Sequence, residues 1–331
     1  MIFVVGNSRS GTTMMSNILE NHLDIYKIHE LHFFEELWTP EENDELLTGS
    51  EALNLANRLL SAQRHDYVFK VTERYIEEAQ KIIRTIDSNS LRAIYIYEAF
   101  LGYEVFKNNC KAACESTPRN VFYIGEILEN FPHAKIINMV RDPRDVLLSQ
   151  KRKWRRSYLR SGGRPLKETL RALINYHPIT ISKLWNAAIS AADKFNDNDR
   201  VCTVRYEDLL KNPENAVSRV CGFVGIDYDQ TLLDIPHTGS SHVKDSKNKG
   251  IRKASGPKWQ GGGLNSTEIY LCQNITMPHL RKHGYEPAAI RANPVLLLYY
   301  FISFPVKLGF ALLLNLGRMR NIADTIKRRL S

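Results

Sequence analysis

The chain begins with the stretch that decides its fold, Ile2-Phe3-Val4-Val5-Gly6-Asn7-Ser8-Arg9-Ser10-Gly11-Thr12-Thr13-Met14-Met15-Ser16-Asn17-Ile18-Leu19. The apolar run at positions 2–5 predicts a strand that is buried on both faces of a parallel sheet. A turn from Gly6 to Gly11 follows, and the next apolar residues recur at helical spacing. A strand, a glycine turn and a helix N-terminus suit an anionic group, because backbone N–H groups and the helix dipole both favour negative charge.

The turn differs in one respect from the triphosphate-binding motif G-x-x-x-x-G-K-[ST]. The spacing from Gly6 to Gly11 is kept, but Thr12 stands at the lysine position and Arg9 supplies a cation inside the turn. An ordinary kinase or ATPase is therefore disfavoured. A nucleoside-triphosphate-binding P-loop protein stays as the second hypothesis.

Composition sets wider bounds on the protein. The 331 residues, 43% of them hydrophobic, predict a globular chain, and the net charge of +9 suits an anionic ligand, a nucleic acid or a membrane surface. The five cysteines are scattered without metal-ligand spacing, so we expect neither a zinc site nor a disulfide framework. The first strand begins at residue 2 with no basic segment before it, which predicts no N-terminal signal or anchor.

Strands and helices alternate along the chain. Apolar runs predict strands at residues 25–28, 67–71, 135–140 and 201–206, and helices are expected over residues 14–22, 41–63, 75–86, 91–109, 119–131, 180–195 and 213–224. This order predicts an α/β fold, namely a P-loop-like parallel sheet flanked by helices on both faces, with a C-terminal apolar helical tail. Residues that follow strands should converge, because ligands bind at the carboxyl ends of such strands.

Three stretches in order resemble motifs of the sulfotransferase superfamily that uses 3′-phosphoadenosine 5′-phosphosulfate (PAPS). Residues 8–13 are similar to its 5′-phosphosulfate loop, in the R-S-G-T-T form of the tyrosylprotein sulfotransferases, and residues 135–149 are similar to its 3′-phosphate strand and helix. Residues 252–259 match its R-K-G-x-x-G-D-W lid at three positions only. The resemblance implies that the donor is bound by Ser8, Arg9, Ser10, Gly11, Thr12, Thr13, Arg141, Ser149, Arg252, Lys253 and Trp259. Arg9 is also a candidate catalytic cation, because its donor fork matches paired sulfuryl or phosphoryl oxygens.

A base is needed because the acceptor hydroxyl must lose its proton as its oxygen bonds to sulfur. The stretch Glu30-Leu31-His32-Phe33-Phe34 resembles the E-x-H-F-F segment of heparan sulfate sulfotransferases, which implies that Glu30 is the general base. His32 is the alternative base, since an imidazole titrates near neutral pH. No metal is required by this scheme.

One departure from the family pattern concerns its donor lysine. The stretch Glu115-Ser116-Thr117-Pro118 resembles an E/D-K-T-P segment of related enzymes, with Ser116 in place of the lysine. Three explanations are open. Lys70 or Arg119 supplies the cation that the lysine provides in related enzymes, Arg9 activates the donor without such a cation, or the activity of this protein is weakened or altered. The stretch 205–209 also resembles a family segment, R-Y-E-D-L, and we interpret it as structural.

Two segments, one basic and one apolar, are candidate contact sites for other molecules. The run at 151–164 suits a solvated helix face, an anionic acceptor or a membrane surface, and no recognition motif supports nucleic acid. Residues 294–316 form the most apolar stretch, although Pro305 and Lys307 argue against a simple membrane span, and a basic tail follows. A membrane-surface segment over 294–331 and a buried helical hairpin or dimer contact are both open.

The sequence as a whole predicts a sulfotransferase domain over 1–285 and a tail over 286–331. The expected reaction moves a sulfuryl group from PAPS to a hydroxyl of a carbohydrate, lipid-linked or small-molecule acceptor and leaves 3′-phosphoadenosine 5′-phosphate. We expect a cytoplasmic protein without a nucleic-acid partner, and contact of its tail with a membrane surface is one of the two alternatives given above. A third hypothesis is a non-catalytic, membrane-associated nucleotide-binding protein. The sequence predicts no oligomeric state.

Overall fold

The centre of the computed structural model is a sheet of five parallel strands in the order β2-β3-β1-β4-β5. The structure describes residues 1–65, 71–153, 166–237, 245–251, 256–315, 324 and 327–329. The sheet strands are β1 (Ile2–Gly6), β2 (Ile25–Ile28), β3 (Ala112–Glu115), β4 (Lys135–Val140) and β5 (Val201–Arg205). An antiparallel pair, β6 (Pro236–His237) and β7 (Asp245–Lys249), lies apart from it.

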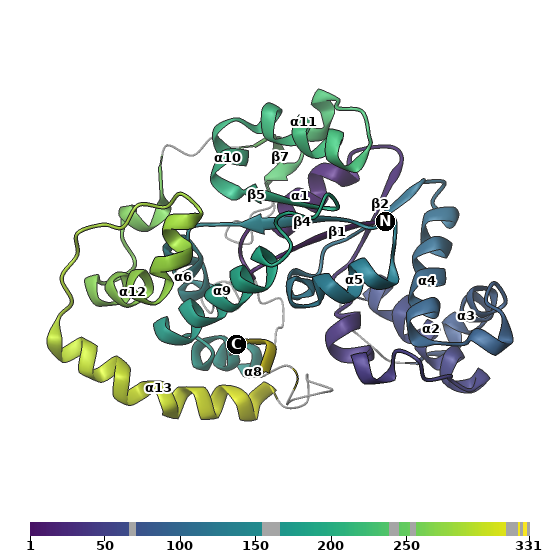
Figure 1. Cartoon of the computed structure of the whole chain (residues 1–331), viewed down its shortest axis with the longest axis horizontal. Helices are drawn as coiled ribbons and strands as arrows, with labels where there is room; N and C mark the ends of the chain where they lie inside the picture. The colour runs from purple at the N-terminus through teal and green to yellow at the C-terminus, as the bar shows by residue number, and fades with distance from the viewer. Residues whose placement is uncertain are drawn as a thin grey trace.

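Helices cover both faces of this sheet, as the sequence predicts (Figure 1). They are α1 (Thr12–Glu20), α2 (Gly49–His65), α3 (Ile76–Ile83), α4 (Ala93–Lys107), α5 (Ile124–Asn130), α6 (Pro143–Lys151), α8 (Leu166–Ile174), α9 (Pro178–Asp193), α10 (Tyr206–Lys211), α11 (Pro213–Val224), α12 (Ser266–Lys282) and α13 (Pro294–Asn315). In Figure 1, α1, α10 and α11 lie on one side of the sheet, and α5, α6 and α9 lie on the other.

Strand β1 is apolar at successive positions because both of its faces are buried. Ile2 and Val4 are buried in the core that includes α1 and α11, whereas Phe3 and Val5 are buried in the core that includes α4 and α5. Both faces of the strand are thus covered, and no polar position is left along it.

One strand of the central sheet was not expected from the sequence. The strand between β1 and β2 is β3, at residues 112–115, where the sequence predicts none. Its sequence, Ala-Ala-Cys-Glu, has no β-branched or aromatic residue, so pairing with its two neighbours fixes the strand against its local preference. Of the strand expected at 67–71, residues 67–70 lie outside the described residues, and Val71 lies in no strand.

The C-terminal apolar helix expected from the sequence is α13. It packs against α8 and α9 as the outermost layer on that side of the molecule (Figure 1). Among the described residues it is the one helix long and apolar enough to cross a membrane. The domain boundary at 285/286 stays a prediction.

Trp185 of helix α9 contacts the main chain directly after β4. The indole of Trp185 is fully buried, and its Nε1 donates a hydrogen bond to the main-chain oxygen of Arg141 at 3.0 Å. This contact fixes the backbone at the point where β4 ends and the turn into α6 begins.

We expect Trp185→Phe to lower the free energy of unfolding by about 2 kcal/mol, because it leaves a small cavity and an unpaired buried carbonyl. Urea denaturation of both proteins measures the change. Phe106→Leu is the matched control, since Phe106 lies on α4 and is 84% exposed. An effect of Trp185→Phe no larger than that of the control would contradict this role.

Candidate active site

The residues expected to form the site follow the strands at one edge of the sheet. The 7–11 turn follows β1, Glu30 follows β2, Ser116 follows β3, Arg141 follows β4 and Tyr206 follows β5. Since the five strands are parallel, these five positions lie at the same edge. Strand β3 separates β1 from β2, so the ends of these two strands are about 10 Å apart.

The turn after β1 has a backbone that only certain residues adopt. Gly6 has φ 143° and lies so close to β4 that a Cβ would come within 2.3 Å of the Met139 oxygen. Gly11 has φ 102°, and a Cβ there would meet the Tyr206 ring at 2.4 Å. Arg9 has φ 79°, which is left-handed and costly for a residue with a side chain. The turn is therefore held in one shape by packing against β4 and α10.

The two expected donor-binding motifs are in direct contact. Arg9 Nε donates to Ser149 Oγ of α6 at 3.0 Å, and Arg141 Nη1 donates to the main-chain oxygen of Arg9 at 3.1 Å. Asp145 accepts from Arg141 Nη2 at 3.3 Å, and the Arg141 guanidinium lies 4.5 Å from the Tyr206 ring centroid. Segments 140 residues apart thus form one cluster.

This cluster has the features of an anion site. Ser10 Oγ and Arg141 Nε are buried, and neither has a hydrogen-bond partner among the described residues. No side chain caps the N-terminus of α1, which begins directly after the turn. Buried polar groups are costly when unpaired, so an anion with several oxygens fits here. The residues present therefore suit a phosphate or sulfuryl group.

The segment matched to the family lid is described only in part. Arg252 and Lys253 lie outside the described residues. Trp259 is buried against the N-terminus of α6, where its backbone N–H donates to Asp145 at 2.8 Å and its Nε1 to Asp142 at 3.3 Å. The lid end of the motif is thus joined to the segment that carries Arg141.

Lys258 adds a cation that the sequence analysis did not select. Partial desolvation, and then the nearby Arg141 and Arg152, lower the pKa of the Lys258 ammonium. Lys258 thus lies near two other cations, Arg141 and Arg152, and the nearby Asp145 opposes their effect on its pKa. Lys258 directly precedes Trp259, which matches the family lid motif, and this is the sequence feature that identifies it as a candidate.

The two candidate bases lie together after β2. Glu30 Oε2 is 3.8 Å from His32 Nε2, and Glu35 Oε2 is 3.3 Å from His32 Nδ1. The His32 ring thus lies between two carboxylates, on a residue with the left-handed φ of 49°. The side chain of Glu30 is 30% exposed and that of His32 is 12% exposed, so the carboxylate of Glu30 is the more accessible of the two.

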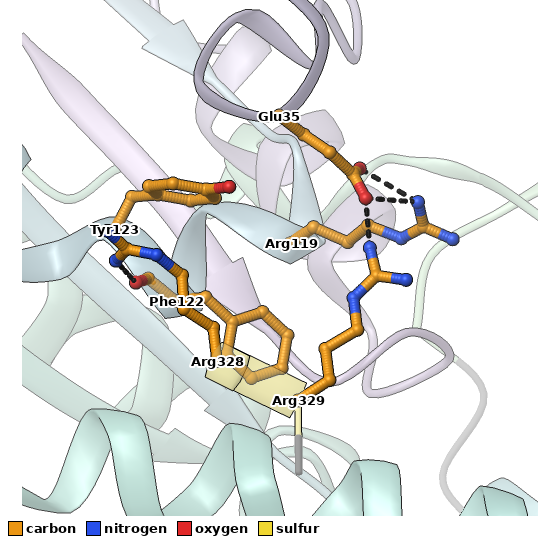
Figure 2. Close-up of a pocket in the computed structure, with 6 residues that line it drawn as sticks. All are labelled: Glu35, Arg119, Phe122, Tyr123, Arg328 and Arg329. Atoms are coloured by element: carbon orange, nitrogen blue, oxygen red, sulfur yellow. Dashed lines mark hydrogen bonds and ion pairs between the residues drawn. The ribbon is translucent and has the colours of Figure 1, made fainter. Parts of the chain in front are cut away.

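Glu35 is the anchor of a second charged cluster. Arg119 Nη1 lies 2.8 Å from each of its carboxylate oxygens, and Arg329 from the C-terminal end also contacts it (Figure 2). Burial disfavours the charged form, but Arg119 and the other partners outweigh it and hold the pKa of Glu35 well below its usual range. Arg119 is therefore directed to Glu35, which weakens its candidacy as the substitute for the family lysine.

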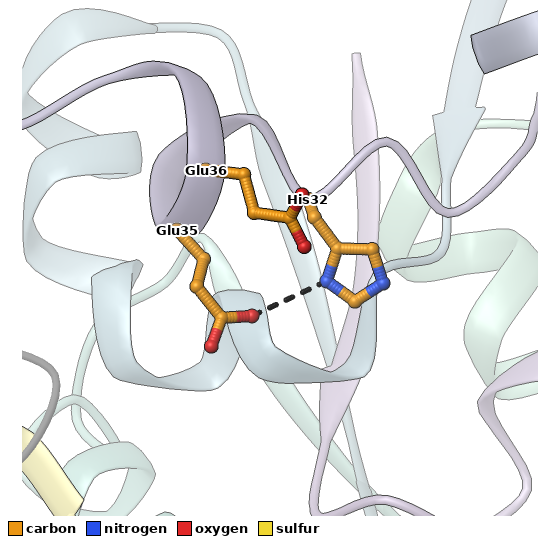
Figure 3. Close-up of side chains that lie close together, drawn as sticks. All are labelled: His32, Glu35 and Glu36. Carbon is orange, nitrogen blue, oxygen red and sulfur yellow. Dashed lines mark hydrogen bonds and ion pairs between the residues drawn. The ribbon is translucent and has the colours of Figure 1, made fainter. Parts of the chain in front are cut away.

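His32, Glu35 and Glu36 also satisfy the spacing of a metal site. Their ligand atoms all lie within 4.8 Å of one another (Figure 3). Two guanidinium groups already neutralise the Glu35 carboxylate, which argues against a cation at this position.

Glu115 joins the loop after β3 to the loop after β2. It accepts from Leu31 N at 3.5 Å, Thr117 N at 3.2 Å and Asn120 Nδ2 at 2.7 Å, and Thr117 Oγ1 contacts it as well. Thr117 Oγ1 in turn accepts from His32 N at 3.3 Å. Burial raises the pKa of Glu115 to about 7 despite these donors. The sequence analysis missed this role, because the strand that carries Glu115 was not predicted.

Comparisons with known proteins agree with these observations. A model described as "Sulfotransferase family" matches residues 2–230. A Caenorhabditis elegans protein named protein-tyrosine sulfotransferase A is 23% identical over 309 residues, which are 88% of this chain and 68% of that protein. An uncharacterized Aquifex aeolicus protein is 22% identical over 267 residues, and this chain spans only 30% of its length.

The solved structures support the fold. The sulfotransferase domain from the curacin biosynthetic pathway has a TM-score of 0.52 and 20% identity, and the match covers 87% of this chain and 98% of that domain. The expected fold class is thereby confirmed.

We expect Glu115 to make stability depend on pH. Its pKa in the folded protein is about 7, above the ordinary 4.5, so its contribution is complete below pH 4.5 and is lost as the pH rises to 7. The loss amounts to about 3 kcal/mol for a shift of this size. Glu115→Gln should remove it, and denaturant unfolding at a series of pH values measures it.

The matched control is Glu98→Gln, because Glu98 is exposed on α4. This control should keep the wild-type pH dependence. If Glu115→Gln kept it too, Glu115 would not titrate in this range.

Proposed function

Because this chain belongs to the sulfotransferase family, we propose that it moves a sulfuryl group from PAPS to a hydroxyl of a carbohydrate, lipid-linked or other small acceptor. The family match confirms the predicted enzyme class, a sulfotransferase, and disfavours the triphosphate-binding alternative. The observation that carries the site assignment is the contact between the two donor motifs through Arg9, Ser149 and Arg141.

Each half of this cluster has a proposed role toward the donor. Residues 8–13 and the N-terminus of α1 bind the 5′-phosphosulfate, with Arg9 as the cation. Arg141 and Ser149 bind the 3′-phosphate, and Arg252, Lys253 and Trp259 are the further donor-binding residues that the family resemblance implies. The support is the buried, unpartnered Ser10 Oγ and Arg141 Nε, which require hydrogen-bond partners that an anion supplies.

The acceptor oxygen forms the new bond to sulfur, and the bond from sulfur to the bridging phosphate oxygen breaks. The electron pair of that bond leaves with 3′-phosphoadenosine 5′-phosphate, and the acceptor proton passes to Glu30. The donor supplies the sulfuryl group. Arg9 and the backbone amides stabilise charge on oxygens in a loose, in-line transition state, by analogy with phosphoryl transfer. No metal enters this scheme.

Glu30 is the proposed base because its carboxylate is the more accessible member of the Glu30–His32 pair. His32 orients Glu30 and is itself held by Glu35 and by the loop after β3. If Glu30 acts by positioning alone, His32 is the base.

Ser116 stands where the family has a lysine, and Arg119 is paired with Glu35. We propose Arg9 as the donor cation, because it contacts Ser149 of the second donor motif. Lys70 lies outside the described residues and stays an alternative.

The acceptor class is the open part of the proposal. The similarity to a protein named protein-tyrosine sulfotransferase adds a phenolic hydroxyl of a polypeptide to the carbohydrate, lipid-linked and small-molecule candidates. Incubation of the protein with sulfur-labelled PAPS and fractions of a cell extract identifies the acceptor by the label it gains. As for location, we expect a cytoplasmic protein that meets a membrane through α13.

We expect Glu30→Gln to reduce transfer to that acceptor by at least about 100-fold while donor binding is kept, because the amide is nearly isosteric and accepts no proton. Unchanged turnover would exclude Glu30 as the base. Measuring His32→Asn in parallel then identifies which member of the pair takes the proton, since only the base shifts the pH–rate profile.

Arg9→Gln should lower kcat by about 100-fold, a larger factor than its effect on donor affinity, because its charge acts chiefly in the transition state. Initial rates at saturating PAPS measure kcat, and calorimetry measures the affinity. Arg84→Gln, at the exposed end of α3, is the matched control and should leave both values unchanged. A loss of donor affinity with an unchanged kcat would contradict the catalytic role, because Arg9 would then act in binding alone.

A further inference from the structure

Helix α13 carries an apolar stripe along one side. The large side chains of this stripe recur at helical spacing, and their exposed fractions lie between 54% and 75%; they are Val295, Leu298, Tyr299, Phe301, Ile302, Val306, Phe310 and Leu313. No charged residue interrupts them, and Pro305 and Gly309 are exposed between them. Exposed apolar surface of this extent marks an interaction site.

The opposite side of α13 is attached to the protein along its whole length. Asn293 N, just before the helix, donates to Thr267 Oγ1 at 2.9 Å, and Tyr300 OH accepts from Asn265 at 3.1 Å. Ser303 Oγ lies 3.2 Å from the His177 ring nitrogen Nε2. Near the end, Lys307 Nζ donates to the Tyr176 oxygen at 3.2 Å, and Arg171 donates to the Leu314 oxygen at 3.3 Å.

These attachments decide between crossing a membrane and lying on one. A 22-residue helix is about 33 Å long, which matches the hydrocarbon thickness, so length alone fits a span. A span would break every one of these contacts and carry Lys307 into hydrocarbon, which is costly. A helix that lies flat keeps all of them and places only the stripe in lipid.

A helix next to α13 also exposes apolar side chains. Helix α8 packs against α13, and its Leu170 and Leu173, three residues apart, are 51% and 42% exposed. Figure 1 shows α8 and α13 together at the outer edge of the molecule, away from α10 and α11.

The charge of residues 287–323 favours an anionic partner. From residue 287 to residue 323 the sequence has no Asp or Glu and has four cations, Arg291, Lys307, Arg318 and Arg320. Anionic lipid headgroups attract such a segment. A second copy fits less well, because a two-fold contact would bring two sets of these cations together.

We propose that α13 is an in-plane membrane anchor, with its apolar stripe inserted at the boundary of headgroups and acyl chains of an anionic bilayer and its other side still docked on α8 and α9. Interfacial helices of this kind insert their apolar side about 5–10 Å deep. The anchor specifies the membrane contact in the proposed function and does not depend on sulfuryl transfer.

Vesicle flotation of the full chain tests the anchor. The protein should float with phosphatidylcholine vesicles that contain phosphatidylglycerol, and less with phosphatidylcholine alone or in high salt. Ile302→Glu with Phe310→Glu should reduce the bound fraction at least about tenfold, because both charges enter the inserted side. Leu23→Glu with Phe106→Glu is the matched control, since these apolar residues are 91% and 84% exposed elsewhere, and it should float as the wild type does.

Depth measurements separate a flat helix from a span. Val295→Cys, Ile302→Cys and Leu313→Cys are labelled singly with an environment-sensitive fluorophore, in a chain whose two partly exposed cysteines, Cys110 and Cys202, are replaced by serine. Quenchers at known depths in the lipid should report one shallow depth for all three sites. A deep label at 302 between two shallow ends would show a span and overturn the proposal.

Three further results would also overturn it. They are no flotation of the wild type, flotation that survives the double substitution, and a concentration-dependent dimer that forms through α13 without vesicle binding. Donor binding measured on the same variants keeps this outcome separate from the reaction, since neither Ile302 nor Phe310 belongs to the proposed donor site.

Discussion

The hydrogen bond from Arg141 to the main-chain oxygen of Arg9 joins the two halves of the proposed donor site. It fixes the turn after β1 relative to the turn after β4, and Trp185 holds the Arg141 backbone from the other side. Arg9 completes the link by reaching Ser149. A donor with phosphates on the 3′ and the 5′ positions of its ribose needs both turns at a set distance, and a parallel sheet with β1 beside β4 supplies that distance.

The base is positioned by a different set of contacts, centred on a buried carboxylate. Glu115 receives donors from the loop after β2 and from the loop after β3, so the main chain around His32 is fixed by the end of a neighbouring strand. Glu35 adds a charged partner for His32 and two guanidinium groups of its own. Glu30 is thereby carried on a rigid loop, although its own side chain reaches solvent.

The sequence was informative where local pattern and position agree. The first strand, the turn from Gly6 to Gly11 and the β4–α6 turn with Arg141 and Ser149 are all visible in it, because a buried strand is apolar and an anion turn needs glycine. Strand β3 was not visible, since its stability comes from two neighbours rather than from its residues. Glu115 was missed together with β3, the strand that carries it. The properties of Glu115 and Lys258 come from burial and nearby charge rather than from residue type. The attachment of α13 along its full length also depends on contacts between distant segments.

The central claim is that this site binds a nucleotide with phosphates on both the 3′ and the 5′ positions of its ribose. A calorimetric titration with 3′-phosphoadenosine 5′-phosphate, 5′-AMP and ATP with Mg²⁺ tests it most directly. The bisphosphate should bind at least about 100-fold more tightly than 5′-AMP, because only the bisphosphate engages Arg141 and Ser149 as well as the turn after β1. Equal affinities for the two, or tighter binding of ATP with Mg²⁺, would contradict it.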